Sequence, residues 1–134
     1  MFEPLLPLST DADLVAMATD LVGEAIRRQT WIFVLDDEHR LSPVVVPMDG
    51  IPTDADPQHI ETLAARLTDL VRMVDGAASV VLVWERTGSG DVLMQEADWF
   101  AGLAATDAPI RAQLLASDDG VRLIDPAFAA LVAN

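Results

Sequence analysis

The segment from Ala77 to Trp84 constrains the fold more than any other part of the chain. Seven of its eight residues are apolar, and it lies between Gly76 and the charged pair Glu85-Arg86. It has the length of a strand and is far shorter than the roughly 20 residues of a membrane-spanning helix. We therefore expect a central strand that is buried on both faces, which requires a sheet covered by helices.

Two helices and a hairpin are predicted ahead of this strand. An N-cap sequence and an apolar stripe at helical spacing predict a helix over residues 10–28, with Gly23 inside it. Residues 30–35 and 41–47 are rich in β-branched residues and flank a polar turn, which predicts a hairpin. A second helix is expected over residues 57–75, because an N-cap Asp and a Pro open it.

Shorter elements follow the central strand. The pattern predicts a helix over residues 95–105, a second hairpin formed by residues 110–116 and 121–124, and a last helix after Asp125-Pro126. The expected order is α-β-β-α-β-α-β-β-α. This order predicts an α/β (α+β) fold with a single mixed sheet of about five strands and helices on its faces.

Length and composition exclude several classes of function. A chain of 134 residues has room for one domain, which we expect over residues 9–134 after an extended lead-in at residues 1–8. The chain has no Cys and no Lys, so thiol nucleophiles, thiolate metal sites and a Schiff-base or phosphate-loop lysine are excluded. Its net charge of -14 argues against nucleic acid and anionic membranes as partners.

The start of the chain and its composition bear on location. Residues 1–4 have no basic region and no continuous apolar run of the kind that a secretory signal needs. We therefore expect a cytoplasmic protein that binds no membrane. All eight cations are Arg, and Ala, Asp and Val are abundant, which is typical of a GC-rich bacterial genome.

Three local patterns occur in a characteristic order. Residues 33–41 contain an apolar strand that ends in Leu-Asp, then a polar turn, and then the start of the second strand at Arg-Leu. An Asp49-Gly50 loop precedes an amphipathic helix, and residues 80–84 lead into the loop 85–91 and then a helix that bears an acid. Together these patterns resemble the JAB/MPN (JAMM) metalloprotease-like family, in its RadC branch. The resemblance covers residues 28–125 and implies the fold of that family.

The resemblance also implies where a zinc site would lie. In that family two His and one Asp hold zinc, and an upstream Glu acts as general base on the bound water. Here the two His positions fall on Trp84 and Arg86, and the Asp lies near Asp98, one residue late and beside Glu96. The upstream Glu falls within residues 28–30, which contain no acid. Neither an indole nor a guanidinium can ligate zinc, so the resemblance implies a domain without metal, cofactor or hydrolase activity.

These residues define a candidate vestigial site or binding surface, made of Trp84, Glu85, Arg86, Gly88, Ser89, Gly90 and Asp98. Backbone N–H groups of the loop could bind an anion with help from Arg86. The other hypothesis is a flexible connection that remained after a catalytic loop lost its function. We expect Trp84 and Trp99 to lie close together, where they fill the former metal pocket or anchor a partner.

Other combinations of reactive residues point to structure rather than chemistry. His39 and His59 could share a metal with nearby acids, but they belong to separate elements that we expect to be exposed. Ser89 lies between glycines without the sequence of a nucleophile elbow, and neither His is placed to serve as its base. Paired carboxylates fall mainly at turns, where Asp forms local hydrogen bonds.

The predicted function is that of a non-catalytic JAB/MPN-like domain, which acts as a protein-interaction, scaffold or dimerisation module. Its partner would be another protein or a second copy of the chain. This hypothesis also predicts a pocket bounded by Trp84, Arg86 and Asp98. Two alternatives remain open. One is a small acidic chaperone-like module that binds a basic protein client, and the other is an enzyme with a site that the sequence does not reveal.

Overall fold

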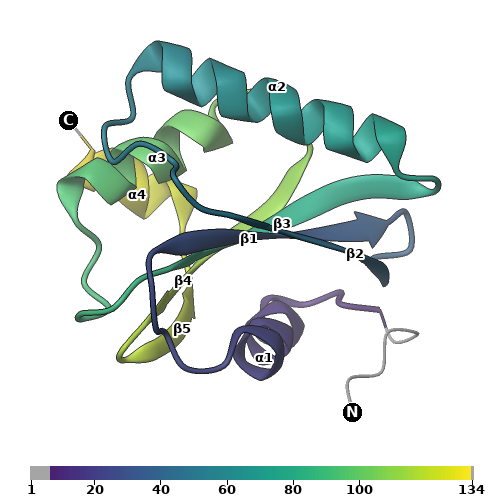
Figure 1. Cartoon of the computed structure of the whole chain (residues 1–134), viewed down its shortest axis with the longest axis horizontal. Helices are drawn as coiled ribbons and strands as arrows, with labels where there is room; N and C mark the ends of the chain where they lie inside the picture. Colours follow the sequence, from purple (N-terminus) through teal and green to yellow (C-terminus); the bar gives the residue numbers. More distant parts are fainter. Residues whose placement is uncertain (1–6, 134) are drawn as a thin grey trace.

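The structure is a computed structural model, and it describes residues 7–133 (Figure 1). The elements in chain order are α1 (Asp11–Val22), β1 (Gln29–Asp36), β2 (Leu41–Met48), α2 (Pro57–Met73), β3 (Ala77–Glu85), α3 (Met94–Ala104), β4 (Ile110–Ser117), β5 (Gly120–Leu123) and α4 (Pro126–Val132). Within the described residues, five strands form one mixed sheet and four helices accompany it. The predicted α+β fold class and the predicted order of elements are confirmed.

The sheet has the strand order β2-β1-β3-β4-β5. β1 pairs antiparallel with both β2 and β3, β3 pairs parallel with β4, and β4 pairs antiparallel with β5. Both predicted hairpins are therefore present. β3 lies in the middle of the sheet, and its residues Val80 to Val83 are completely buried. This confirms the prediction of a central strand that is buried on both faces.

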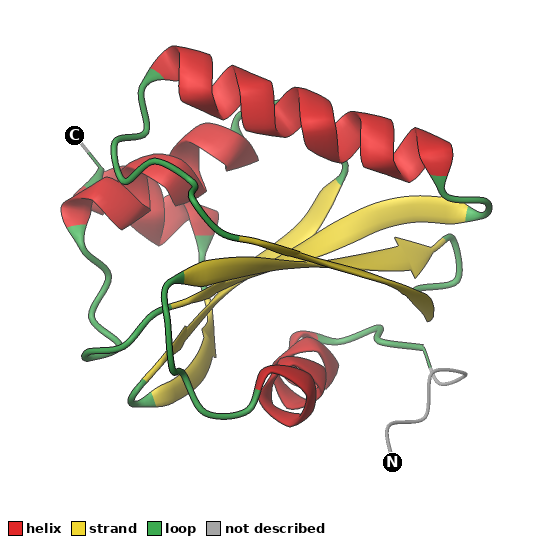
Figure 2. Ribbon diagram, in the orientation of Figure 1, coloured by secondary structure: helices red, strands yellow, loops and turns green. Residues whose placement is uncertain are grey.

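Helices cover both faces of the sheet (Figure 2). On one face lie α2, α3 and α4, where Leu67 and Phe100 belong to the same buried cluster as Leu82. α1 lies on the other face, where Leu14 belongs to a second cluster with Val83. Successive residues of β3 thus enter two separate cores, as the alternation of side chains along a strand requires. None of the helices within residues 7–133 is long and apolar enough to span a membrane.

The first helix is shorter than the sequence predicted. It ends at Val22 rather than at residue 28, because Gly23 takes a φ of 69° that a right-handed helix cannot continue through. The N–H groups of Ile26 and Arg27 then donate to the carboxylate of Glu85 instead of to helical carbonyls. The apolar spacing that continues past Gly23 was misleading, since Ile26 is 72% exposed.

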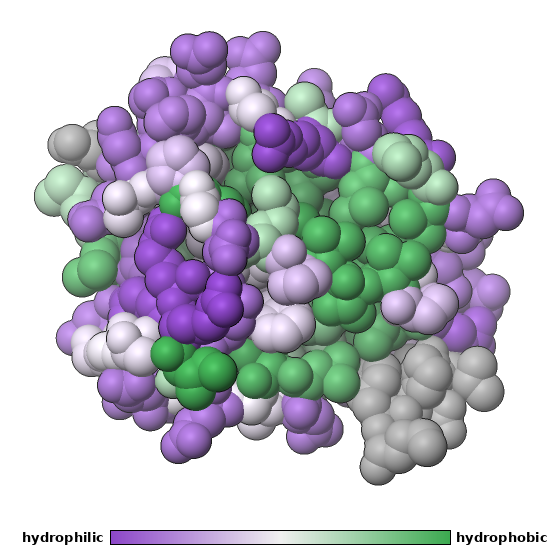
Figure 3. All heavy atoms as spheres, in the orientation of Figure 1, coloured by the Kyte–Doolittle hydropathy of each residue, from purple (hydrophilic) through white to green (hydrophobic). Residues whose placement is uncertain are grey.

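The β1–β2 hairpin forms an apolar edge of the sheet. Val44, Val46 and Met48 are partly buried on the α2 face, and Val45 is exposed. Figure 3 shows the corresponding continuous apolar surface below α2. Pro43 and Pro47 have no N–H group to offer a further strand, so this edge is protected against strand addition.

Only the end of the expected lead-in lies within the described residues. Pro7 forms an isolated antiparallel bridge with Arg40, and the N–H of Leu8 donates to the carbonyl of His39 at 2.7 Å. Leu8 is buried in the cluster on the α1 face. Residues 1–6, which make up the rest of the predicted lead-in, lie outside the described residues.

Candidate functional site at the end of the central strand

A cavity of about 190 Å³ opens at the C-terminal end of β3. Its lining comes from four parts of the chain: the start of β1, the loop after β2, the end of β3 and the first turns of α3. The start of β1 and the end of β3 meet there because the two strands are antiparallel, with Gln29 opposite Glu85. The antiparallel register therefore creates the cavity, and it brings together segments that lie far apart in the sequence.

Three aromatic side chains form the inner wall of this cavity. The ring centroid of Trp84 lies 5.7 Å from that of Trp99 and 5.7 Å from that of Phe100. The indole N–H of Trp84 donates to Oε1 of Gln113 at 3.1 Å, and that of Trp99 donates to the carbonyl of Pro52 at 2.9 Å. The expected proximity of Trp84 and Trp99 is confirmed, and both indole N–H groups have partners within the protein.

Arg86 uses all five of its N–H donors inside the protein. Nε and Nη2 donate to the two carboxylate oxygens of Glu96, the latter at 2.9 Å. The remaining donors bind the carbonyls of Thr87 at 3.2 Å, Ser89 at 2.6 Å and Asp91 at 2.8 Å. The hydrogen bond to Glu96 raises the pKa of Arg86 and outweighs the opposite effect of burial. Arg86 therefore acts as the centre around which the loop 87–91 is arranged.

The turn between β4 and β5 holds the same loop from the other side. The N–H of Gly88 donates to Oδ2 of Asp118 at 3.0 Å, and the N–H of Gly90 donates to Oδ2 of Asp119 at 2.7 Å. Arg122 also donates to the carbonyl of Gly90 at 3.1 Å. The glycine N–H groups that the sequence suggested for an anion are thus bound to the protein's own carboxylates, and the loop is fixed at both glycines.

Glu85 points to the opposite face of the sheet from the aromatic wall and is 2% exposed. One carboxylate oxygen accepts from the N–H groups of Ile26 at 2.8 Å and Arg27 at 3.3 Å. The other accepts from the side chains of Gln29 at 2.9 Å and Trp31 at 2.8 Å. Burial acts to raise the pKa of Glu85, but these four hydrogen bonds favour the charged form and together lower the pKa below its ordinary value. Glu85 is therefore a structural anchor for the connection between α1 and β1.

The predicted boundary of the pocket is correct for Trp84 and Arg86 and wrong for Asp98. Asp98 does not line the cavity, and the acid that α3 contributes is Glu96. Glu96 also accepts the N–H of Leu93 at 2.9 Å, so it caps the helix that carries it. Arg28 also lines the cavity, and it could not be identified from local sequence patterns because its place depends on the pairing of β1 with β3.

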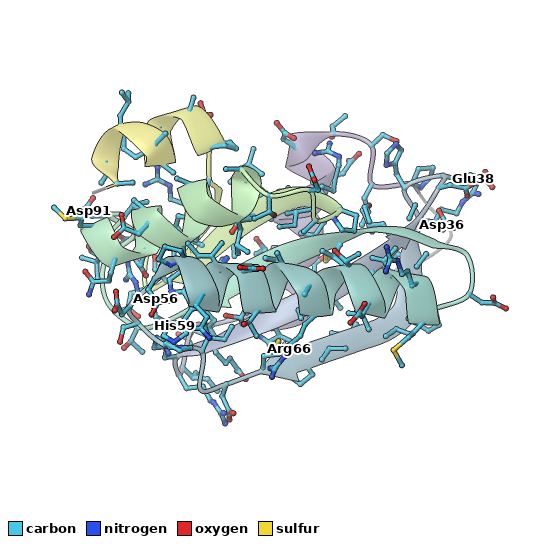
Figure 4. The ribbon with its side chains drawn as sticks, turned by 90° about the horizontal axis from the view of Figure 1, so that it is seen from above. Asp36, Glu38, Asp56, His59, Arg66 and Asp91 are labelled. Atoms are coloured by element: carbon cyan, nitrogen blue, oxygen red, sulfur yellow. The ribbon has the colours of Figure 1, made fainter. Side chains whose placement is uncertain are left out.

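The two histidines lie on separate elements, and Ser89 lies in the loop before α3. Figure 4 shows His59 beside Asp56 at the start of α2, and Asp36 and Glu38 at the distant β1–β2 turn, to which His39 also belongs. Within residues 7–133, no group of three or more His, Cys, Asp and Glu side chains is arranged to hold a metal ion. The hydroxyl of Ser89 accepts the N–H of Asp91 at 3.3 Å, which is a local turn contact.

Comparison with protein-family models gave no match, and comparison with curated proteins gave none either. The similarity to the JAB/MPN family therefore stays a prediction from the sequence.

Proposed function

We propose that this chain is a non-catalytic domain of the JAB/MPN type that acts as a protein-interaction module. The observation that carries the proposal is the complete engagement of Arg86, whose five donors bind Glu96 and three loop carbonyls. In the family that the sequence resembles, a zinc-binding His stands at this position. A guanidinium fixed in this way has no lone pair for a metal and would repel a cation.

The other groups around the cavity support the same proposal. Trp84, at the second His position, donates its N–H to Gln113 and has no acceptor for a metal. Glu96 is occupied by Arg86 and by the start of its own helix. Glu85 accepts four hydrogen bonds and has a lowered pKa, which makes it a poor general base.

The apolar surface of the β1–β2 hairpin supports the interaction role. Val44, Val46 and Met48 lie on one face of an edge strand and are only partly buried, while α2 packs mainly on β3 and α3. Because Pro43 and Pro47 oppose strand addition, a partner would lie against the face of the hairpin. We propose a second copy of the chain as the first partner to test, since an apolar face of this kind can pair with itself.

Two measurements test the proposal. The purified chain should bind zinc no more tightly than millimolar in a calorimetric titration, and stoichiometric tight zinc would contradict the non-catalytic assignment. Sedimentation velocity should show concentration-dependent dimers that Val44→Asp abolishes and that Ala65→Asp, a change at an exposed position of α2, leaves intact. A chain that stays monomeric at all concentrations would remove the second copy as the partner.

Charge favours a second candidate function, the acidic chaperone-like module. Glu85 is the only buried acidic residue within residues 7–133, so the remaining described carboxylates are at least partly exposed in a chain of net charge -14. Such a surface would attract a basic client. Binding to a basic test protein should then weaken steeply as salt rises, because exposed charges are screened. Binding that does not depend on salt would exclude this candidate.

A further inference from the structure

The cavity at the end of β3 has a size and lining that an interaction module does not require. Its volume of about 190 Å³ is close to the ~150 Å³ of an engineered apolar cavity that binds benzene. Trp84, Trp99 and Phe100 form its inner wall, and Ile51 and Leu93 add apolar side chains. A single planar ring fits this space, and aromatic rings pack favourably against indoles and phenyl rings.

The mouth of the cavity carries a cation without a carboxylate partner. Within residues 7–133, Arg28 has one hydrogen bond, from Nη1 to the carbonyl of Ile51 at 2.6 Å. Its neighbour Arg27 instead pairs with Asp49 at 2.8 Å. Nε and Nη2 of Arg28 are therefore available to a ligand, and a guanidinium matches the two oxygens of a carboxylate in geometry and charge.

No unpaired acid opposes Arg28 at this site. Glu96 is neutralised by Arg86 in a two-point ion pair. The carboxylate of Glu85 lies on the other face of the sheet, where its four donors hold it. Arg28 would therefore repel a cationic ligand, and no free carboxylate would attract one. An anionic ligand would be attracted to Arg28.

We propose that this cavity binds a small aromatic carboxylate of one ring, with the ring against Trp84 and Trp99 and the carboxylate on Arg28. Benzoate is the simplest probe of this class. Its ring is small enough for the volume of the cavity, and its carboxylate would bind Arg28, an exposed residue of the lining. The proposal is independent of the interaction role, because Trp84, Trp99 and Arg28, which would contact the ligand, lie outside the β1–β2 hairpin.

Nuclear magnetic resonance can locate the ligand, because the chain has three Trp residues and only two of them line the cavity. Titration with benzoate should shift the indole N–H signals of Trp84 and Trp99 and leave that of Trp31 unchanged. We expect saturation with a dissociation constant on the order of a millimolar or below, as suits a ligand with few atoms. An absence of saturable shifts, or equal shifts at all three indoles, would overturn the proposal.

A pair of Arg variants tests the role of Arg28. Arg28→Gln should weaken benzoate binding about tenfold, which corresponds to the loss of one charged hydrogen bond. Arg72→Gln removes the same charge from an exposed position of α2 that does not line the cavity, and it should leave binding unchanged. Benzyl alcohol, a neutral ring of the same size, should bind both variants equally. If the two Arg variants weaken benzoate to the same degree, or Arg28→Gln has no effect, the assignment of the carboxylate to Arg28 is wrong.

Discussion

The guanidinium of Arg86 and the carboxylate of Glu96 form a two-point ion pair that joins the end of β3 to the first turn of α3. Their side chains are only 15% and 18% exposed. The pair is therefore largely removed from water, and it also organises the loop between the two elements. Much of the order at this end of the molecule depends on these two residues.

Replacing Arg86 should destabilise the protein substantially. Arg86→Gln leaves Glu96 without its cation and frees the carbonyls of Ser89 and Asp91. We expect a loss of about 2–4 kcal/mol in the free energy of unfolding, since breaking a buried ion pair leaves an uncompensated charge. Urea denaturation followed by tryptophan fluorescence measures this loss. Arg72→Gln is the matched control, because Arg72 is 76% exposed and should contribute almost nothing.

Glu85 should make stability depend on pH in the acid range. Its pKa is lower in the folded chain than in the unfolded chain. The stabilisation is therefore fully present above the unfolded value, about 4.3, and is lost as the pH falls through the folded pKa. In Glu85→Gln the amide group cannot accept all four hydrogen bonds, so the variant should be less stable than wild type by about 2 kcal/mol at pH 7.

The difference between wild type and Glu85→Gln should shrink as the pH falls from the unfolded pKa through the folded pKa, because the protonated carboxyl group of Glu85 accepts hydrogen bonds little better than an amide does. Urea unfolding at a series of pH values gives both curves. A difference that stays constant across this range would mean that the charge of Glu85 does not contribute to stability.

Gly102 provides the contact between α3 and α2. A Cβ atom at this position would lie 2.3 Å from Cδ1 of Ile60, which is far inside van der Waals contact. Gly102→Ala should therefore displace the end of the Ile60 side chain, and the net change in stability should stay within about 1 kcal/mol, since this displacement offsets the gain in helix propensity. Ile60→Val removes the crowded methyl group. The double variant should therefore be more stable than the sum of the two single effects predicts. Additive effects in this double-mutant cycle would contradict the proposed contact.

Asp118 and Asp119 should each protect one glycine of the loop from hydrogen exchange. Asp118→Ala removes the acceptor of the Gly88 N–H, and Asp119→Ala removes that of the Gly90 N–H. Each variant should speed exchange at its own glycine by tenfold or more and affect the other glycine less. Amide exchange measured by nuclear magnetic resonance separates the two. Fast exchange at both glycines in the wild-type protein would show that the loop is not held.

Local patterns in the sequence were sufficient to predict most of the fold. The start of α2 was predictable because Asp56 caps it by accepting the N–H of His59, and Pro57 occupies its first turn. The central strand was predictable from its apolar length. The end of α1 was not, because the acceptor that diverts the N–H of Ile26 is Glu85, 59 residues further along.

The candidate site was predictable only in part, for the same reason. Trp84 and Arg86 were chosen because the resemblance to the JAB/MPN family places its two His positions on them. Asp98 rather than Glu96 was predicted as the acid of α3 that lines the pocket, because the sequence does not show which side of α3 faces the end of β3. Arg28 carries no local signal, and it reaches the cavity through the register of β1 on β3.

The carboxylate of Glu85 has a consequence for the newly made chain. During synthesis α1 and the start of β1 leave the ribosome long before Glu85 does, so the N–H groups of Ile26 and Arg27 have no native acceptor until then. The central strand β3 that β1 pairs with arrives at the same time. The N-terminal third of the chain therefore cannot reach its final arrangement alone, and it becomes part of the folded protein only when the middle of the sequence has emerged.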